Sequence, residues 1–341
     1  MEAMRWTLCL LAGCVPELID DTPYVDEPRV LAIRLDPPEA VPGATVRASA
    51  LFADAEGLVD GDPFVWSFCV ARKPLAELGP VSPRCYEPGE AWEAMDGAQG
   101  ALPADGCARF GPNPPPAEAG ESGGRPVDPD PSGGYYQPVV ASRPAVDEEP
   151  TLAFARLRCG IPNVNQETFV AWNRAYRDNV SPMPETLSVV GEAGTVVPWE
   201  GTGDAIEVQA GATMTLEVAW PACPDSASCG DGVCSPEEDV TTCRDDCEIP
   251  TGCNGAERYV VWDTADKILR LRREALSIAW YVTGGTVAEA RTGRSADDPE
   301  RTSRNEWTAP SSAGEVWGAV VLRDDRGGVG YRSFRVRVRD P

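Results

Sequence analysis

Six cysteines are concentrated in the stretch 223–253. Four of them follow the spacing C-x4-C-x8-C-x3-C (Cys229, Cys234, Cys243 and Cys247), and Cys223 and Cys253 flank these four. Cysteines at such a density form disulfides or hold a zinc ion. The C-x2-C pairs of zinc ribbons are missing, and the stretch has too few apolar residues for a core of its own. We therefore expect disulfides among the inner four cysteines and a further one between Cys223 and Cys253.

Carboxylates crowd the same stretch. Residues 229–247 hold six aspartates and glutamates against one arginine. Ca²⁺ prefers such oxygen-rich surroundings, and a bound ion would relieve the repulsion between the carboxylates. The pattern of an EF-hand loop is absent, so a solvated acidic surface is the alternative. The calcium hypothesis places the ligands at Asp231, Glu238, Asp239 and Asp246, and the sequence indicates no other cofactor.

Cys14 stands in a different setting, close to the start of the chain. Residues 1–14 read MEAMRWTLCLLAGC, with one cation, a largely apolar stretch and small residues just before Cys14. This order is typical of a secretory signal, which we expect over residues 1–13. No other segment approaches the roughly 18 consecutive apolar residues of a membrane span.

The number of cysteines supports an exported chain. Of twelve, Cys9 would leave with the signal and Cys14 would begin the mature chain. Ten remain, and an even number in an exported protein indicates disulfide bonds. The ten are Cys69, Cys85, Cys107, Cys159, Cys223, Cys229, Cys234, Cys243, Cys247 and Cys253.

The composition excludes several classes of function. The 341 residues carry Lys+Arg 30 against Asp+Glu 54, a formal net charge of −24, and no histidine. A nucleic-acid partner needs a basic face, so we expect none. Without histidine, Ser-His-Asp and Cys-His catalysis are removed, and neither a phosphate loop nor a dinucleotide fingerprint occurs. We expect no enzyme; hydrolysis of a glycoside by two carboxylates is the weaker alternative.

Alternating apolar residues predict two similar sets of β-strands, in residues 28–54 and 184–220. In each, a Gly-Ala-Thr triplet precedes an alternating strand, and a later strand carries a central tryptophan, Trp66 or Trp280. This order is typical of immunoglobulin-like (Ig-like) sandwiches, whose third strand packs a tryptophan into the core. Two β-rich runs around the turn that follows Asp324 predict a closing hairpin. The predicted fold class is therefore all-β, with two Ig-like β-sandwich domains.

Three short parts of the sequence resemble bacterial families. The motif LAGC, which ends at Cys14, resembles the lipobox and implies cleavage before Cys14 and a diacylglyceryl group on its thiol. Val15 in the next position implies export to the outer membrane. The closing strands resemble bacterial Ig-like and PKD-like modules. The run CGDGVC, which begins at Cys229, resembles cysteine-rich repeats of extracellular bacterial proteins, a family without a uniform activity.

These patterns divide the chain. We expect a lipoprotein signal peptide over residues 1–13, a lipid-anchored acidic tether over 14–28, and Ig-like domains over 29–180 and 184–341. Residues 111–134 are rich in Pro and Gly and predict a disordered insertion in the first domain, flanked by Cys107 and Cys159. Residues 223–253 form an insertion in the second domain. Residues 168–177 predict a short helix with Phe169, Trp172 and Tyr176 packed against a core.

The resulting functional expectation is a non-catalytic, lipid-anchored protein of the cell envelope. It would lie on the periplasmic face or the cell surface of the outer membrane and serve adhesion, surface structure or binding of an unidentified envelope protein or polysaccharide. The alternative is an accessory polysaccharide- or protein-binding lipoprotein subunit of an exported machine. An exposed aromatic platform would favour carbohydrate binding, and a large exposed apolar patch would favour a protein partner. A carboxylate pair in a cleft would favour glycoside hydrolysis.

Overall fold

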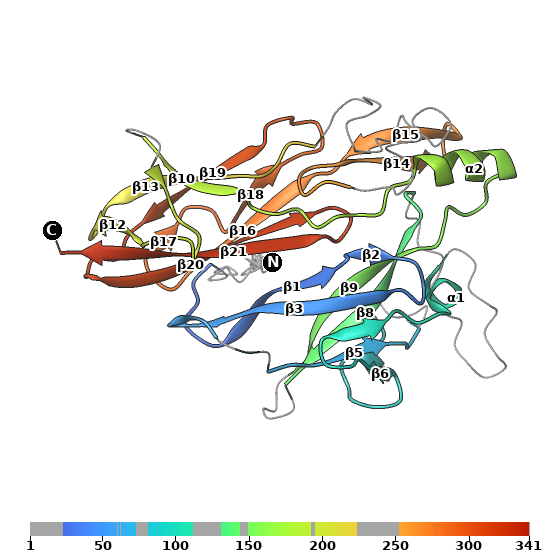
Figure 1. Cartoon of the computed structure of the whole chain (residues 1–341), viewed down its shortest axis with the longest axis horizontal. Helices are drawn as coiled ribbons and strands as arrows, with labels where there is room; N and C mark the ends of the chain where they lie inside the picture. Colours follow the sequence, from blue (N-terminus) through green and yellow to red (C-terminus); the bar gives the residue numbers. More distant parts are fainter. Residues whose placement is uncertain are drawn as a thin grey trace, which may run out of the picture.

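The computed structural model describes residues 23–59, 61, 63–72, 81–111, 131–143, 149–191, 195–223 and 252–340. Nearly all regular structure within them is β, arranged as two sandwiches side by side (Figure 1). The all-β class predicted from the sequence is confirmed. Cys14, the inner four cysteines of the insertion and the four predicted calcium ligands lie outside the described residues. None of the helices in the described ranges has the length and apolar character to cross a bilayer.

The first sandwich packs two sheets around a core that includes Trp66. One sheet contains β1 (Arg29–Asp36), β3 (Thr45–Asp54), β4 (Gly57–Leu58) and β7 (Gln99–Ala101). The other has the order β2 (Glu39–Ala40), β9 (Thr151–Arg158), β8 (Gly134–Ser142), β5 (Val65–Cys69) and β6 (Trp92–Ala94). Trp66 is 1% exposed, and Val46 and Ala48 of β3 are equally buried. The period of two in β3 therefore faces this core, as the alternation predicts.

The second sandwich repeats this plan around Trp280. Its first sheet has the order β11 (Thr195–Val196), β10 (Thr186–Val190), β13 (Thr213–Ala219), β19 (Thr302–Thr308) and β17 (Thr286–Val287). Its second sheet has the order β12 (Ile206–Gln209), β21 (Val329–Arg339), β20 (Gly314–Asp324), β16 (Leu276–Val282) and β18 (Arg291–Arg294). Trp280 lies on β16 and is 1% exposed. The predicted closing hairpin is β20–β21.

The two sandwiches share one unusual pairing. A short early strand runs parallel to the last long strand of the same domain, β2 beside β9 in the first and β12 beside β21 in the second. The other strand pairs within the sandwiches are antiparallel. In both domains the early part of the chain thus contributes strands to both sheets. The two similar stretches of sequence therefore fold in a similar way.

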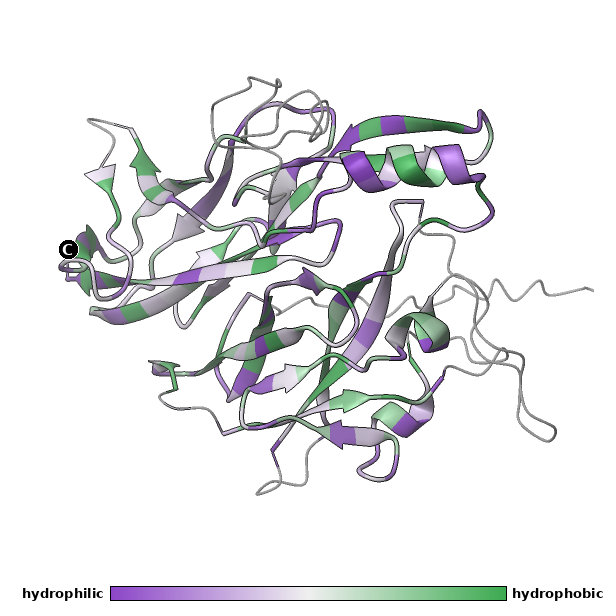
Figure 2. Ribbon diagram, turned by 45° about the vertical axis from the view of Figure 1, so that its right-hand side comes forward, coloured by the Kyte–Doolittle hydropathy of each residue, from purple (hydrophilic) through white to green (hydrophobic). Residues whose placement is uncertain are grey.

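A helix and a separate hairpin extend the second domain. α2 (Gln166–Ala175) begins where the Asn165 side chain accepts a bond from the Thr168 amide at 2.8 Å, a standard N-cap. It lies alongside the hairpin of β14 (Arg258–Asp263) and β15 (Ile268–Arg273) (Figure 2). Trp172 and Tyr176 are buried there, but Phe169 is 43% exposed. The prediction that all three aromatics pack into a core was wrong for Phe169, whose ring lies 5.6 Å from that of Trp172 but stays open to solvent.

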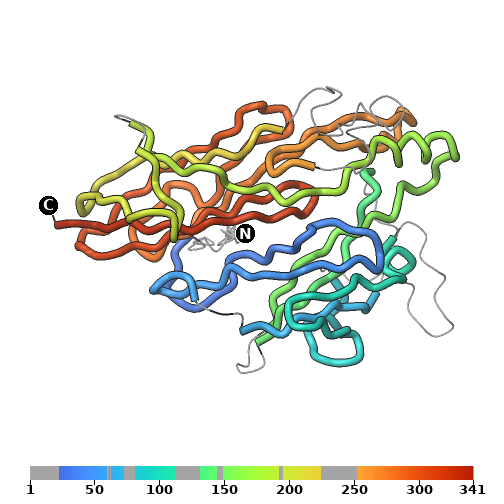
Figure 3. The backbone as a smooth tube through the Cα atoms, viewed as in Figure 1, coloured from blue at the N-terminus to red at the C-terminus, as the bar shows by residue number. Residues whose placement is uncertain are grey.

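An apolar interface joins the two sandwiches. Leu31, Ala32 and Leu51 of the first domain form one buried cluster with Trp317 and Val321 of the second. The tube drawing shows β1 running beside the β20–β21 hairpin (Figure 3). The interface therefore unites strands from opposite ends of the chain, and the site described next lies at its edge. The remaining elements, η1 (Pro83–Cys85) and α1 (Gly106–Phe110), belong to the first domain, where α1 contacts β8 and β9.

Candidate functional site

Arg326 is the centre of a buried charge cluster between the domains. Its side chain is 1% exposed and lies in the turn between β20 and β21. Nη2 donates to Glu39 of the first domain at 3.0 Å and to the carbonyl of Arg177, in the linker, at 2.6 Å. Nη1 donates to Glu257 at 2.8 Å and to Glu274 at 3.4 Å, both in the second domain. One guanidinium thus joins three separate parts of the fold.

Glu39 is the contribution of the first domain to this cluster. Its side chain is fully buried, and Arg156 of β9 lies 3.2 Å from its Oε2. The Tyr176 hydroxyl donates to Oε1, and the Asn179 amide donates to Oε2 at 2.8 Å. Burial acts to raise the pKa of Glu39, but Arg156, Arg326 and these hydrogen bonds together hold it below its ordinary value. Glu39 is therefore a stable carboxylate.

Glu257 and Glu274 have the opposite character. Burial raises the pKa of Glu257 to about 7, although Arg326 acts to lower it. Burial also raises the pKa of Glu274 well above its ordinary value, and the neighbouring Glu257 adds to this. The two residues are linked directly, because the Glu257 amide donates to Glu274 Oε2 at 3.1 Å. Carboxyl groups with raised and lowered pKa values therefore meet on one arginine.

The local sequence explains how Arg326 is held. Asp324 Oδ1 accepts the amides of Arg326 at 2.9 Å and of Gly328 at 2.7 Å, so the aspartate closes the turn on itself. Gly327 has a φ of 98°, a conformation that glycine adopts without strain. The arginine is thereby directed back toward the first domain. Arg326 also lies over the ring of Tyr259, 4.9 Å from its centroid.

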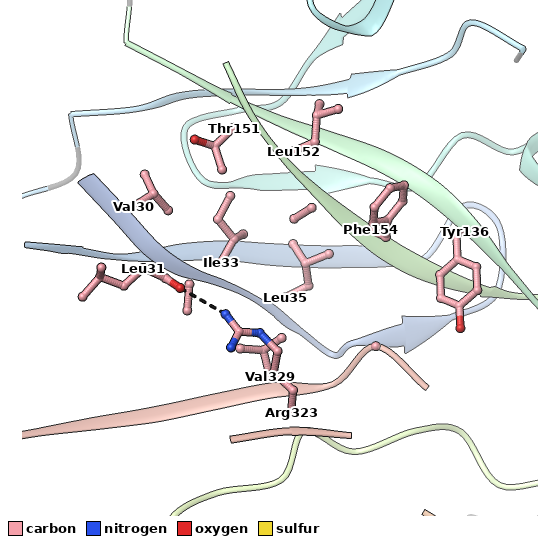
Figure 4. A pocket seen from close by; sticks show the side chains of 13 residues that line it. Val30, Leu31, Ile33, Leu35, Tyr136, Thr151, Leu152, Phe154, Arg323 and Val329 are labelled. Atoms are coloured by element: carbon pink, nitrogen blue, oxygen red, sulfur yellow. Dashed lines mark hydrogen bonds between the residues drawn. The ribbon is translucent and has the colours of Figure 1, made fainter. Parts of the chain in front are cut away.

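A cavity of about 310 Å³ lies on the other side of the same turn (Figure 4). Two walls come from the first domain: β1, with Val30 to Ile33 and Leu35, and β9, with Thr151 to Phe154. The third wall comes from the second domain, with Arg323, Gly327 and Val329. Arg323 Nη2 donates to the Leu31 carbonyl at 3.0 Å, the dashed line in the figure. Most of the lining side chains are apolar, but polar atoms form nearly as much of the cavity surface. The volume of the cavity is at the lower end of ligand pockets.

Two strand edges face this cavity. Among the described strands, β1 pairs with β3 on one side and has no partner on the other. β9 pairs with β8 along its length, but on its other side β2 reaches only Arg156 and Leu157. Residues 151–155 of β9 thus present an edge that no described strand covers. Such an edge can pair with an extended segment of another chain.

Three disulfides are present among the described residues: Cys69–Cys85, Cys107–Cys159 and Cys223–Cys253. The third closes the base of the cysteine-rich insertion, the pairing expected for its flanking cysteines. The second brackets the Pro- and Gly-rich insertion. Disulfides are rare in reducing compartments, so the three bonds indicate an extracellular or envelope protein.

Other predicted features are placed as follows. No group of three metal-ligating side chains occurs among the described residues, and the predicted calcium site lies outside them. Arg335, Arg337 and Arg339 of β21 face solvent as predicted, with ion pairs to Glu200, Glu207 and Glu315. Tyr24 and Phe169 are the exposed large aromatics of the described chain; Tyr24 pairs with Val282 of β16 and Phe169 lies on α2, so they stand on separate elements.

The sequence analysis missed Glu39, Arg156, Glu257, Glu274 and Arg326. A charged residue in a turn or a short strand is normally solvated, so nothing in the local pattern marks four of them. Arg156 is the exception: it follows the apolar run of β9, opposite Tyr136 of β8 and on the same face as Leu152 and Phe154, where another apolar residue is expected. That interruption was the one signal available.

Comparisons with known proteins provide no family. The sequence matches no family model and none of the curated proteins. Solved structures of similar shape include a nucleoside hydrolase-related hypothetical protein from Saccharophagus degradans, dimeric latent PorU from Porphyromonas gingivalis, and a mutant of Salmonella alpha-2-macroglobulin. Identities are 14%, 11% and 9%, with TM-scores of 0.21, 0.17 and 0.18.

Coverage of these structures is also low. They align with 48%, 93% and 90% of this chain, which spans only 26%, 34% and 16% of their own lengths. At such TM-scores the similarity carries no argument about function.

Proposed function

We propose that this chain is a non-catalytic binding protein of the cell envelope, anchored to the outer membrane by a lipid on Cys14. The observation that carries the proposal is the cavity of about 310 Å³, lined mostly by apolar side chains, at the edge of a fixed domain interface. Because its walls come from both domains, it exists only while the domains keep one orientation. The Arg326 cluster and the apolar interface supply that constraint.

The cavity suits an extended segment of an envelope protein. The unpaired edge at residues 151–155 of β9 offers backbone hydrogen bonds, and the apolar walls accept alternate side chains of an added strand. The absence of an aromatic platform from the described surface weighs against the alternative, an accessory polysaccharide-binding subunit. A protein-binding accessory subunit of an exported machine is compatible with the same cavity.

The charge cluster favours a binding role over hydrolysis. Its carboxyl groups are 0–5% exposed and already bonded to Arg326, Arg156 or backbone amides. A glycosidase needs two carboxyl groups open to substrate in one cleft. The three disulfides support the envelope location, and LAGC supports the anchor. We further propose that the acidic insertion binds calcium, which would raise the melting temperature of the second domain.

Filling the cavity tests the proposal. Thr151 lines it and is half-buried at the start of β9. The variant Thr151→Trp should lose a protein that tagged wild type captures from solubilised envelope, because the indole would occupy the added strand's place. Thr195→Trp is the matched control, since Thr195 is exposed at the start of β11 in the other domain. Equal capture by both variants would contradict the proposed site.

A further inference from the structure

The turn at residues 324–328 belongs both to the wall of the cavity and to the charge cluster. Gly327 lines the cavity, as do Arg323 and Val329 on either side of the turn. Asp324 and Arg326 of the same turn enter the charge cluster. Residues that line the cavity and residues of the cluster are direct neighbours in this short turn. The turn therefore cannot leave the cluster without moving the cavity wall.

Carboxyl groups outnumber guanidinium groups in the cluster. Glu39 has both Arg156 at 3.2 Å and Arg326 Nη2 at 3.0 Å. Glu257 and Glu274 both contact one nitrogen, Nη1 of Arg326, at 2.8 Å and 3.4 Å. Their side chains are 5% and 0% exposed, so water screens neither charge. Two full negative charges on one nitrogen in such surroundings are strongly unfavourable.

We infer that Glu257 and Glu274 hold one proton between them near neutral pH, and that its loss releases the turn at residues 324–328 and with it the third wall of the cavity. The protein would thus bind its partner in a pH-dependent manner. The consequence for binding rests on the proposed function, whereas the proton and the movement of the turn do not.

The pKa values agree with the geometry. Burial is the main cause that raises the pKa of both glutamates, and Asp324 raises them further. Burial raises the pKa of Asp324 itself, although the Gly328 and Arg326 amides act to lower it. The pKa of Arg326 is raised above its ordinary value by Glu39, Glu257 and Glu274, against burial, so the arginine stays charged throughout.

The other groups that face the cluster do not replace this proton. Tyr259 of β14, two positions after Glu257, donates to Asp325 at 3.4 Å, and burial raises its pKa, so it keeps its own proton. Tyr176 behaves in the same way beside Glu39. From β15, Arg272 pairs with Asp325 at 3.5 Å, and from the linker Asp178 pairs with Arg158 at 3.1 Å. The Arg177 side chain is bonded to the carbonyls of Arg174 and Tyr176. Arg258 stands opposite Arg273 on the hairpin, beside Glu257 and Glu274 in sequence.

The first measurement is an NMR titration of the side-chain carboxyl carbons in the whole chain. One of the two glutamates should titrate with a midpoint near 7 in wild type, without any partner present. Over the same range the amides of Arg326 and Gly328, which bond to Asp324, should exchange hydrogen about tenfold faster than the intrinsic pH effect accounts for.

Three variants locate the effect. Glu257→Gln and Glu274→Gln each remove one charge, so each should abolish the extra exchange and keep the turn protected above pH 7. Glu200→Gln is the control, a partly buried carboxylate of the same domain that pairs with Arg335 and has a lowered pKa. It should leave the titration and the exchange unchanged.

Two results would overturn the inference. If both carboxyl carbons titrate in the ordinary range of glutamate, no proton is shared. If one titrates near 7 but exchange at Arg326 and Gly328 stays constant, the proton does not control the turn. Neither result depends on a captured partner, so a failure of the proposed function would be seen separately, in the Thr151→Trp experiment.

Discussion

Arg326 is a buried cation with four hydrogen-bond acceptors, and its removal is expected to destabilise the folded protein strongly. Arg326 forms an ion pair with Glu39 and shares its other nitrogen between Glu257 and Glu274, and all four side chains are buried. Removal of one partner from such an arrangement leaves uncompensated buried charge, which is the unfavourable part of any buried ion pair.

Arg326→Met is therefore expected to destabilise the protein by about 3–5 kcal/mol, as measured by urea unfolding. Arg304→Met is the comparison, because Arg304 is 61% exposed and pairs with Glu217 at the surface. That substitution should change stability by no more than about 0.5–1 kcal/mol. Similar losses in the two variants would show that the cluster does not join the domains.

Glu257 gives stability a dependence on pH with a definite sign. Its pKa of about 7 in the folded state lies above the ordinary 4.5, so the folded state binds the proton more tightly. Its contribution is complete below pH 4.5 and is lost as pH rises to 7, in total about 3 kcal/mol. Urea unfolding across this range should show a larger loss of stability in wild type than in Glu257→Gln, where Glu274 and Asp324, whose pKa values are also raised, still contribute. Glu39, with a lowered pKa, acts in the opposite sense and loses its contribution in acid.

Single residues were predictable where their neighbours in sequence decide their environment. Trp66 and Trp280 were assigned to the cores because alternation with period two fixes which side of a strand is buried. Glu39 and Arg326 were not, because their environment is each other, and they are 287 positions apart. No local pattern distinguishes a charged turn that faces water from one that faces another domain.

At the scale of elements, two disulfides of the first domain close loops of different length. Cys107–Cys159 closes a separation of 52 residues and Cys69–Cys85 one of 16. The first joins α1 to the end of β9, and the second joins β5 to η1. Both keep irregular segments attached to the same sheet.

Removal of these bonds should therefore have unequal effects. In the chain-entropy description the longer loop contributes about 4 kcal/mol and the shorter about 3 kcal/mol. The double variants Cys107→Ser with Cys159→Ser, and Cys69→Ser with Cys85→Ser, can be compared by thermal unfolding of the whole chain. A larger loss for the shorter loop would indicate that packing around Cys69 and Cys85, both fully buried, outweighs loop entropy.

Elements were predicted well where strand and turn signals adjoin, and poorly where pairing is distant. The β20–β21 hairpin follows from two apolar runs around an Asp- and Gly-containing turn, and α2 from its aromatic spacing. The β14–β15 hairpin was not identified, because its arginines on β15 obscure the alternation of Leu269 and Leu271. The parallel pairs of β2 and β12 with later strands also depend on contacts that no short window contains.

For the whole molecule, the sequence repeat predicts two sandwiches and says nothing about how they meet. The interface depends on contacts such as that of Arg323 with Leu31, 292 positions apart. The cavity is a product of that interface, so it could not be predicted from either domain. The same holds for the charge cluster, which borrows from both domains and from the linker.

The anchor concerns the whole molecule as well. Replacement of Cys14 by Ser is expected to release the protein from the membrane fraction, because no acyl chain could then be attached. Fractionation and mass spectrometry of the intact chain measure this directly. Wild type without lipid, together with a variant that still sediments with membranes, would contradict the lipobox assignment.

The first described residues have a mechanical consequence. Val25 donates to the Val282 carbonyl at 2.9 Å and Val282 donates to the Pro23 carbonyl at 2.8 Å, so the entry of the chain is attached to β16 of the second domain before β1 begins. A pull applied at Pro23 would therefore load the C-terminal sandwich first. The N-terminal sandwich follows these bonds in the chain and connects back to the second domain. It would therefore carry no force until the hydrogen bonds to Val282 break. For a protein pulled from its amino terminus, these two hydrogen bonds would protect the first sandwich, which supplies two walls of the cavity, from small forces.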